Sequence, residues 1–220
     1  MWRRRKLAFG TPPRQRRQRV AWAWVVLVGA LLSASLYLLL LVLAPVYTAP
    51  SVPGKSWDEP PKKPTISEDR IYIPRLSLNM PYSAGSARVL DNALWHRYAD
   101  RGDPAKGGNF ILAGHRFELA PTPQETRRKS PLYHIDKIQV GDYVYADFNG
   151  ERYQYRVTRN YSVKPTQTEI EAPSETPKMT MYTCTLGGEW DGREVIEATL
   201  VKDKVDPSEE LKVSSDYRAS

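Results

Sequence analysis

The chain has 220 residues and a formal net charge of +7, a length that allows one ordinary domain with appendages. Eight of its 32 basic residues lie within the first 19 positions, where no acidic residue occurs, so the rest of the chain carries 24 basic against 25 acidic groups. A nucleic-acid-binding domain keeps its excess positive charge in its folded part, and this distribution therefore argues against a nucleic-acid partner.

Residues 20–44 form an uncharged stretch of 25 amino acids directly after the basic residues 1–19. As a helix rising ~1.5 Å per residue it would be ~37 Å long, enough to cross a hydrocarbon layer of ~30 Å. The positive-inside rule puts residues 1–19 in the cytoplasm and everything after the span outside the cell. A cleaved signal peptide is the competing interpretation, but its apolar region is normally only ~7–15 residues long. We therefore expect an uncleaved, single-pass anchor in the cell membrane.

Three further segments follow the predicted span. Residues 45–65 contain six prolines and predict a semi-extended stalk. Residues 66–201 combine short strands and tight turns with little helix, which is typical of a small antiparallel barrel or sandwich. The charged residues 202–220 predict a disordered tail.

Within the β domain, several strands can be placed from their patterns. Arg70–Ser83 alternates like one strand, and Asn109–His115 reads as a buried strand that ends in a turn. Residues 143–163 predict a hairpin around Asn149-Gly150. The last two strands are expected to flank Thr185–Gly192.

Cys184 is the only cysteine, so it cannot form an intramolecular disulfide. It is therefore either a buried small hydrophobe or a reactive thiol. It ends a strand-like run and meets a glycine-bearing loop, a position where a side chain becomes accessible to a substrate. Taken alone, Cys184 is more often a buried strand cysteine, and the residues around it decide in favour of a nucleophile.

A catalytic thiol needs a proton donor and a group that stabilises an oxyanion. Of the three histidines, His115 ends an apolar strand as Cys184 does, whereas His96 and His134 lie in less regular stretches. Arg193 opens the strand after Cys184, and a hairpin would return its guanidinium to the same rim, where it could bind an oxyanion without losing a proton. Each residue taken alone also fits a structural role.

Neither a metal nor a cofactor is predicted. One cysteine and three scattered histidines show no metal-ligand spacing, which argues against zinc. No phosphate loop or dinucleotide fingerprint occurs.

Together these residues resemble the sortases, which are membrane-anchored cysteine transpeptidases. The run Thr180–Cys184 is similar to the family signature Thr-Leu-x-Thr-Cys, with Met181 in place of leucine. The family histidine, in a Gly-His turn after an apolar strand, falls on His115, and the family arginine falls on Arg193. The similarity covers about residues 67–201.

The resemblance implies an all-β fold with minor helix, an eight-stranded closed β-barrel preceded by one transmembrane helix. It implies that Cys184 attacks a C-terminal sorting signal like Leu-Pro-x-Thr-Gly on a secreted protein and forms a thioacyl-enzyme. His115 would serve as acid and base, Arg193 would stabilise the oxyanion, and Thr183 would support the substrate or the oxyanion. The acyl acceptor would be an amine of a cell-wall precursor or a pilin lysine.

Some members of this family bind calcium through acidic loops. Glu169, Glu171 and Glu175 would suit such a site but are equally ordinary in a solvated loop, so no metal is expected. Two other functions stay open: a thiol hydrolase that needs no amine acceptor, and a non-catalytic surface module that binds peptides.

Overall fold

The computed structural model describes residues 14–47 and 68–202. The chain divides into two compact units, Met1–Leu40 and Leu41–Ser220. Most of the expected stalk and nearly all of the expected tail lie outside the described residues, and both stay predictions.

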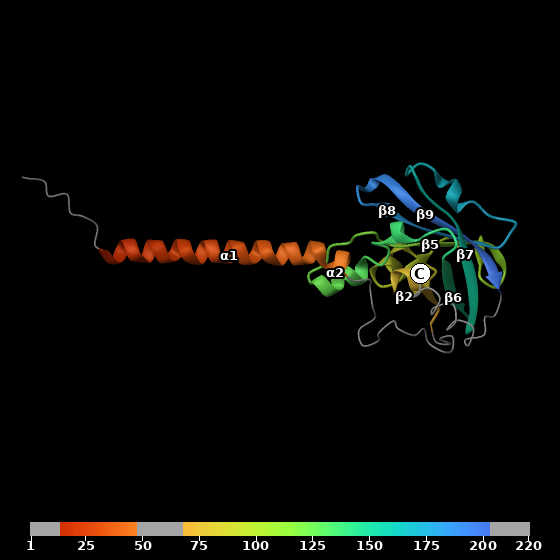
Figure 1. The fold of residues 1–220 in the computed structure, drawn as a ribbon, viewed down its shortest axis with the longest axis horizontal. Coiled ribbons are helices and arrows are strands. Elements are labelled where there is room, and N and C mark those ends of the chain that lie inside the picture. Colours follow the sequence, from red (N-terminus) through yellow and green to blue (C-terminus); the bar gives the residue numbers. More distant parts are fainter. Residues whose placement is uncertain (1–13, 48–67, 203–220) are drawn as a thin grey trace, which may run out of the picture. The chain divides into compact units, whose positions relative to one another are not determined.

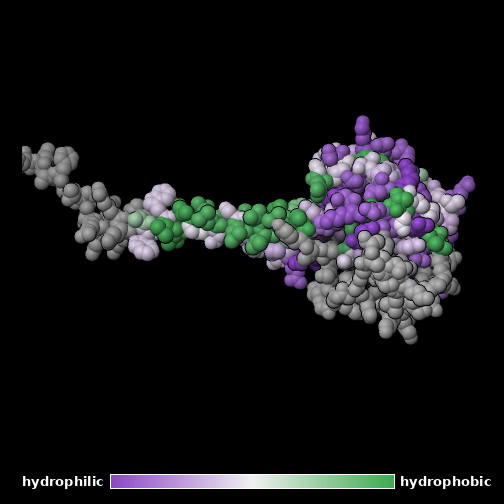
Figure 2. All heavy atoms as spheres, viewed as in Figure 1, coloured by the Kyte–Doolittle hydropathy of each residue, from purple (hydrophilic) through white to green (hydrophobic). Residues whose placement is uncertain are grey.

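The N-terminal helix α1 spans Arg14–Tyr47 and is drawn in red to orange in Figure 1. Its stretch Ala21–Val46 has a mean hydropathy of 2.6 and is long and apolar enough to cross a membrane. Apolar residues cover most of its surface in Figure 2. The hydroxyls of Ser33 and Ser35 donate to carbonyls one turn earlier in the helix, so these polar groups are satisfied internally. The apolar helix expected over residues 20–44 is confirmed, and it continues to Tyr47.

The second unit is a closed barrel (Figure 1). Its strands pair in the order β3-β2-β1-β6-β7-β9-β8-β5, and β3 also pairs with β5, which closes the ring. A short further strand, β4, pairs with β5 outside that ring. The expected eight-stranded closed barrel is therefore confirmed. Its strands are β1 (Arg70–Ile73), β2 (Leu78–Ser83), β3 (Leu94–His96), β4 (Gly102–Asp103), β5 (Gly107–Ala113), β6 (Tyr143–Phe148), β7 (Glu151–Val163), β8 (Lys178–Thr185) and β9 (Gly188–Lys202).

Helix is a minor component of this unit. Besides α2 (Pro123–Lys129) there are four 3₁₀ turns in the described part of the unit. They are η1 (Pro74–Leu76), η2 (Ala87–Asp91), η3 (Ile135–Lys137) and η4 (Thr168–Glu171).

The prediction of one continuous strand over Arg70–Ser83 is wrong. The segment forms two antiparallel strands, β1 and β2, joined by η1. Pro74 lacks the N–H that a strand would need and begins the 3₁₀ turn, and Ser77 then takes a left-handed conformation with φ 48°. The chain reverses there, so that Ile73 pairs with Leu78.

The hairpin predicted around Asn149-Gly150 is confirmed. Asn149 and Gly150 both have positive φ, 51° and 78°, as a two-residue turn between twisted strands requires. The turn joins β6 to β7, which pair from Phe148 with Glu151 onward. Inside this pair, Asp147 and Arg152 form a fully buried ion pair with Nε–Oδ1 at 2.6 Å.

Apolar residues gather on both sides of the wall made by β5, β8 and β9. The inner side belongs to the barrel core and includes Leu112, Met181 and Ile196. The outer side carries a smaller cluster, which we call the outer cluster, and η4 contributes one residue to it. The outer cluster consists of Ile111, Ala113, Ile170, Tyr182 and Val195, with Trp95, Tyr161 and Val163 packed at its edge.

Candidate active site

Cys184 and Arg193 lie directly opposite each other on the antiparallel strands β8 and β9. Met179 and Met181 point into the barrel core, and because strand side chains alternate, Cys184 points to the outer face. Val195 belongs to the outer cluster, so Arg193 points to that face as well. The half-buried thiol and the guanidinium therefore share the outer face of the barrel wall, as the sequence predicted.

Backbone carbonyls in the connection between β8 and β9 accept hydrogen bonds from the Arg193 guanidinium. The register moves from Cys184 opposite Arg193 to Thr185 opposite Gly188, which leaves residues 189–192 as a bulge in β9. Nη1 of Arg193 donates to two carbonyls of that bulge, Glu189 at 2.8 Å and Gly192 at 2.9 Å. These bonds fix one edge of the guanidinium, whose charge and other donors stay available on the outer face.

His115 follows the end of β5, the strand on the other side of β8. The parallel pairing of β5 with β8 ends at Ala113 opposite Tyr182, and the N–H of Gly114 still donates to the Tyr182 carbonyl at 3.2 Å. If this register continued for two more residues, His115 would fall opposite Cys184, but the strand pairing itself ends at Ala113. The His115 carbonyl accepts from the Leu132 N–H at 3.2 Å, which fastens the backbone after the strand ends.

Gly114 is needed for this close approach. A Cβ at this position would lie 2.7 Å from Cδ2 of Leu94 and 2.8 Å from Cδ1 of Leu132. With any larger residue here, either these two buried leucine side chains or the backbone that carries His115 must shift.

The two other histidines have structural environments. His96 is buried, its Nε2 lies 3.0 Å from the Gly102 carbonyl oxygen, and its ring packs edge-on against Phe110. Burial lowers the pKa of His96 and also that of His134, which packs against Tyr133. His115 is the histidine that directly follows a strand paired with the cysteine strand, and its role as the acid and base stays a prediction.

Thr183 points the opposite way from Cys184. It shares the inner side with Met181, its exposed fraction is 1%, and its Oγ1 has no hydrogen-bond partner among the described residues. Its hydroxyl lies under the cysteine strand rather than beside the thiol, and the role expected for it stays a prediction.

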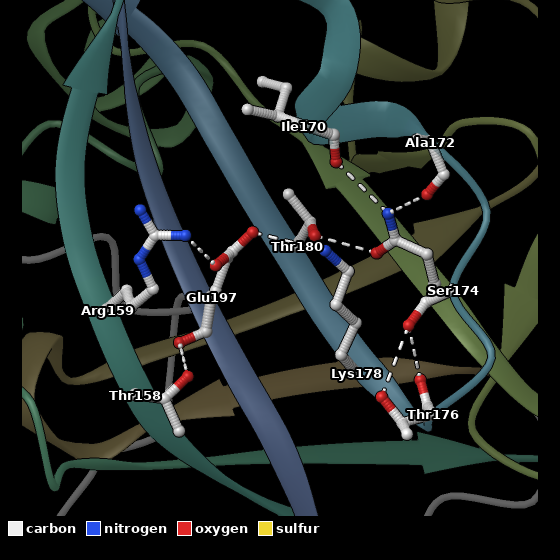
Figure 3. Close-up of polar contacts among 10 residues, drawn as sticks. Thr158, Arg159, Ile170, Ala172, Ser174, Thr176, Lys178, Thr180 and Glu197 are labelled. Atoms are coloured by element: carbon white, nitrogen blue, oxygen red, sulfur yellow. Dashed lines mark hydrogen bonds and ion pairs between the residues drawn. The ribbon is translucent and has the colours of Figure 1, made fainter.

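The segment between β7 and β8 is fastened against the outer cluster by side chains that sequence reasoning did not single out as anchors. Nδ2 of Asn109 donates to the carbonyls of Ile170 and Ala172, at 3.1 and 2.8 Å, and Oδ1 of the same amide accepts from Thr180. Figure 3 labels the three partners of this amide, which are Ile170, Ala172 and Thr180. Asn109 was visible in the sequence only as the first residue of an apolar strand.

Glu171 makes the second anchor of this segment. Its buried carboxylate accepts from the Tyr182 hydroxyl and forms an ion pair with Arg97 at 3.1 Å. Burial and the hydrogen bond to Glu171 raise the pKa of Tyr182, so this hydroxyl stays protonated and remains a donor. Tyr182 stands two positions before Cys184 on the same face of β8.

Glu171 is therefore part of a protein-internal network, while Glu169 and Glu175 are exposed. Among the described residues, no group of three or more His, Cys, Asp or Glu side chains is arranged to hold a metal ion.

Comparisons with known proteins indicate the family of the barrel. Residues 71–201, more than half of the chain, match the family model described as "Sortase domain". The chain is 29% identical over 133 residues to sortase SrtE1 of Streptomyces coelicolor, an alignment that covers 52% of this chain and 35% of that protein. It is 28% identical over 145 residues to sortase A of Bacillus anthracis, with 61% and 60% covered. The chain thus spans less than two thirds of the length of either relative.

Solved structures resemble the chain in the same way. A sortase D5 transpeptidase of Clostridium perfringens has a TM-score of 0.52 at 26% identity, covering 61% of this chain and 79% of that one. Sortase E of Streptomyces avermitilis has a TM-score of 0.51 at 26% identity, covering 68% and 92%.

Proposed function

Because the chain belongs to the sortase family, whose members are cysteine transpeptidases, we propose that it cleaves a sorting signal on secreted proteins and transfers the acyl group to an amine. The signal is a C-terminal peptide similar to Leu-Pro-x-Thr-Gly, and the acceptor is an amine of a cell-wall precursor or a pilin lysine. The observation that carries the proposal is the opposition of Cys184 and Arg193, with His115 just beyond the end of the neighbouring strand.

In the first half-reaction the thiolate of Cys184 attacks the carbonyl carbon of the Thr–Gly bond of the signal. A carbon–sulfur bond forms, the carbon–nitrogen bond breaks, and His115 gives a proton to the leaving amine. In the second half-reaction the acceptor amine attacks the thioester, His115 takes its proton, and the thiolate leaves. Protons and bonds balance over the two steps.

Arg193 is suited to stabilise the oxyanion of both tetrahedral intermediates. Its Nη1 is already held by the carbonyls of Glu189 and Gly192, so little reorganisation is needed when negative charge develops nearby. The planar guanidinium carries several N–H donors and no acceptor, so it can donate to the oxyanion in both half-reactions.

The outer cluster lies on the thiol's face of the wall and is itself buried, and only its edge, formed by Trp95, Tyr161 and Val163, is partly exposed. Tyr182 and Val195 lie on the same face as Cys184 and Arg193, and Ile170 of η4 packs against them. An apolar side chain of the signal would lose water against this partly exposed edge, while its backbone crosses the cysteine strand. The segment held by Asn109 and Glu171 forms the border of this surface.

The helix α1 supports a membrane location. With the basic residues 1–19 in the cytoplasm, the barrel lies outside the cell, where signals and amine acceptors are found. Anchoring would keep the enzyme close to substrates that are themselves held at the membrane.

The test uses the full chain in detergent micelles and a pool of peptides varied around Leu-Pro-x-Thr-Gly, with and without triglycine. Intact-mass spectrometry should detect an acyl adduct on Cys184, and triglycine should yield an amine-exchanged peptide. We expect Cys184→Ala to abolish the adduct and His115→Ala to lower turnover by at least ~10²-fold, the size of a general acid–base contribution. The matched control His134→Gln should retain activity.

Other outcomes would indicate the rival functions. An adduct that reacts only with water, even with triglycine present, would indicate a thiol hydrolase. Peptide binding without an adduct, unchanged in Cys184→Ala, would indicate a non-catalytic binding module and refute the proposal.

A further inference from the structure

A layer of polar side chains lies on the inner face of the barrel wall, directly beneath the proposed catalytic residues. Thr183 precedes Cys184 on β8, Glu194 follows Arg193 on β9, and the two are cross-strand partners. Both have the inward parity of the core residues on their strands.

Arg116, which directly follows His115 in the sequence, also contributes its side chain to this layer. Its side chain is only 7% exposed. Nη2 donates to Oδ1 of Asp136 on η3 at 2.8 Å, and Nη1 lies 3.9 Å from Oε1 of Glu194. Arg116 therefore spans the barrel end between η3 and β9.

Glu194 is itself fixed from the far side. Its other carboxylate oxygen, Oε2, accepts from the hydroxyl of Ser162 on β7 at 3.0 Å. Ser162 and Glu194 are cross-strand partners, so this bond holds the carboxylate to the ladder. Oε1 is left on the side that faces Arg116.

Arg116 is a buried cation whose N–H groups are only partly hydrogen-bonded within the described residues. Its Nε and Nη1 have no hydrogen-bond partner among the described residues, although both are buried. A buried donor left unsatisfied costs about 1–3 kcal/mol, and apolar replacements for buried ion pairs are often equally stable. A contribution to stability alone is therefore a weak reason for an arginine here.

We propose that Arg116 is a positioning residue that ties the segment carrying His115 to the strand carrying Arg193, through its ion pair with Glu194. The inference rests on the proposed function, because it concerns the relative placement of the acid–base group and the oxyanion donor. Arg116 directly follows His115 in the sequence, and Glu194 directly follows Arg193. The ion pair between them therefore limits how far His115 and Arg193 can move apart.

A positioning role predicts a particular kinetic pattern. Loss of the link leaves the outer cluster and the binding segment unchanged, so KM for the signal peptide should change by less than about threefold. A displacement of the imidazole of only ~1 Å should lower kcat by about tenfold to a hundredfold. Because both residues serve one link, removing both should cost no more than removing either.

The experiment compares Arg116→Met, Glu194→Gln and the double variant in the full chain. Arg159→Met is the matched control, because it breaks another ion pair to β9, the one with Glu197 at 3.1 Å, on the exposed surface (Figure 3). We expect kcat to fall in both single variants and no further in the double variant, with the control unchanged. Glu194→Gln keeps the shape of the side chain and remains informative if Arg116→Met folds poorly.

A second measurement does not depend on activity. In NMR spectra of histidine-labelled protein, Arg116→Met and Glu194→Gln should shift the ring resonances of His115 and leave those of His96 unchanged. Unchanged His115 resonances, or equal kcat in wild type and variants, would overturn the inference. A wild type without acyl adduct would instead refute the proposed function, and the NMR comparison would still decide whether the link exists.

Discussion

The anchoring of the segment between β7 and β8 gives the sharpest structural prediction, and Asn109→Ala is the perturbation that tests it. The Asn109 side chain is fully buried and makes three hydrogen bonds. Two of them hold the carbonyls of Ile170 and Ala172, and the third binds Thr180 within the sheet (Figure 3). Alanine removes all three and offers no substitute.

The expected size follows from those bonds. A buried hydrogen bond contributes a net ~1 kcal/mol, so the whole domain should lose about 3 kcal/mol of unfolding free energy. The bond to Thr180 joins β5 to β8 and stays intact when η4 opens locally. Only the two bonds to Ile170 and Ala172 resist that opening, so Asn109→Ala should lower its free energy by about 2 kcal/mol. Since 1.4 kcal/mol corresponds to a factor of ten, the open population should rise roughly 30-fold.

Hydrogen exchange followed by mass spectrometry measures this population directly. Amides in residues 168–172 should exchange roughly 30-fold faster in Asn109→Ala, while those of β6 should change much less. Ser174→Ala is the control within the same segment, because it removes only exposed contacts, with the Thr176 carbonyl and the Thr176 hydroxyl. Exchange in residues 168–172 that accelerates less than about threefold, despite a lower global stability, would refute the view that Asn109 holds the segment.

Three further predictions concern the barrel itself. Gly114→Ala should lower the free energy of unfolding by about 1–3 kcal/mol, because the new methyl group overpacks against two leucine side chains. It should also lower turnover, because it displaces His115. Denaturant unfolding measures the first effect and enzyme kinetics the second. Burial lowers the pKa of His96 below 6.5 in the folded state, so the unfolded chain binds the proton more tightly. The free energy of unfolding should therefore fall as the pH drops below about 6.5. In urea titrations at several pH values, His96→Gln should show a weaker dependence of this free energy on pH. Arg152→Leu should lose about 3–5 kcal/mol of unfolding free energy because Asp147 would stay buried without its ion-pair partner, whereas a loss below about 1 kcal/mol would contradict that reasoning.

The barrel could be predicted from the sequence where local rules decide the outcome. The turn at Asn149-Gly150 needs positive φ at both residues, and these two amino acids accept it most readily. The closing strand β3 is different: it has only the three residues Leu94–His96, too few to show an alternation. The alternation of Arg70–Ser83 contains Pro74, and whether such a proline bulges a strand or ends it depends on the partners of the following residues, which the sequence does not show.

The candidate site could be predicted to a similar depth. The pairing of Cys184 with Arg193 follows from joining two adjacent strands in a hairpin, which is a local argument. The anchors could not be found this way, because Arg97 and Glu171 are far apart in the sequence and meet only when the barrel closes. Composition gave no reason to separate Glu171 from Glu169, since burial alone distinguishes them.

Side chains alternate along β8 and β9, and this separates the proposed catalytic residues on the outer face from the residues behind them on the inner face. Cys184 and Arg193 face outward only because Thr183 and Glu194, one position away, face inward, and a register slip of one residue would exchange the two sets. The bulge of residues 189–192 lies beyond the Cys184–Arg193 pair, so it supplies carbonyls to the guanidinium without altering the register below. The strand pairing thus fixes which atoms meet, and the irregular backbone beyond it fixes how the arginine is held.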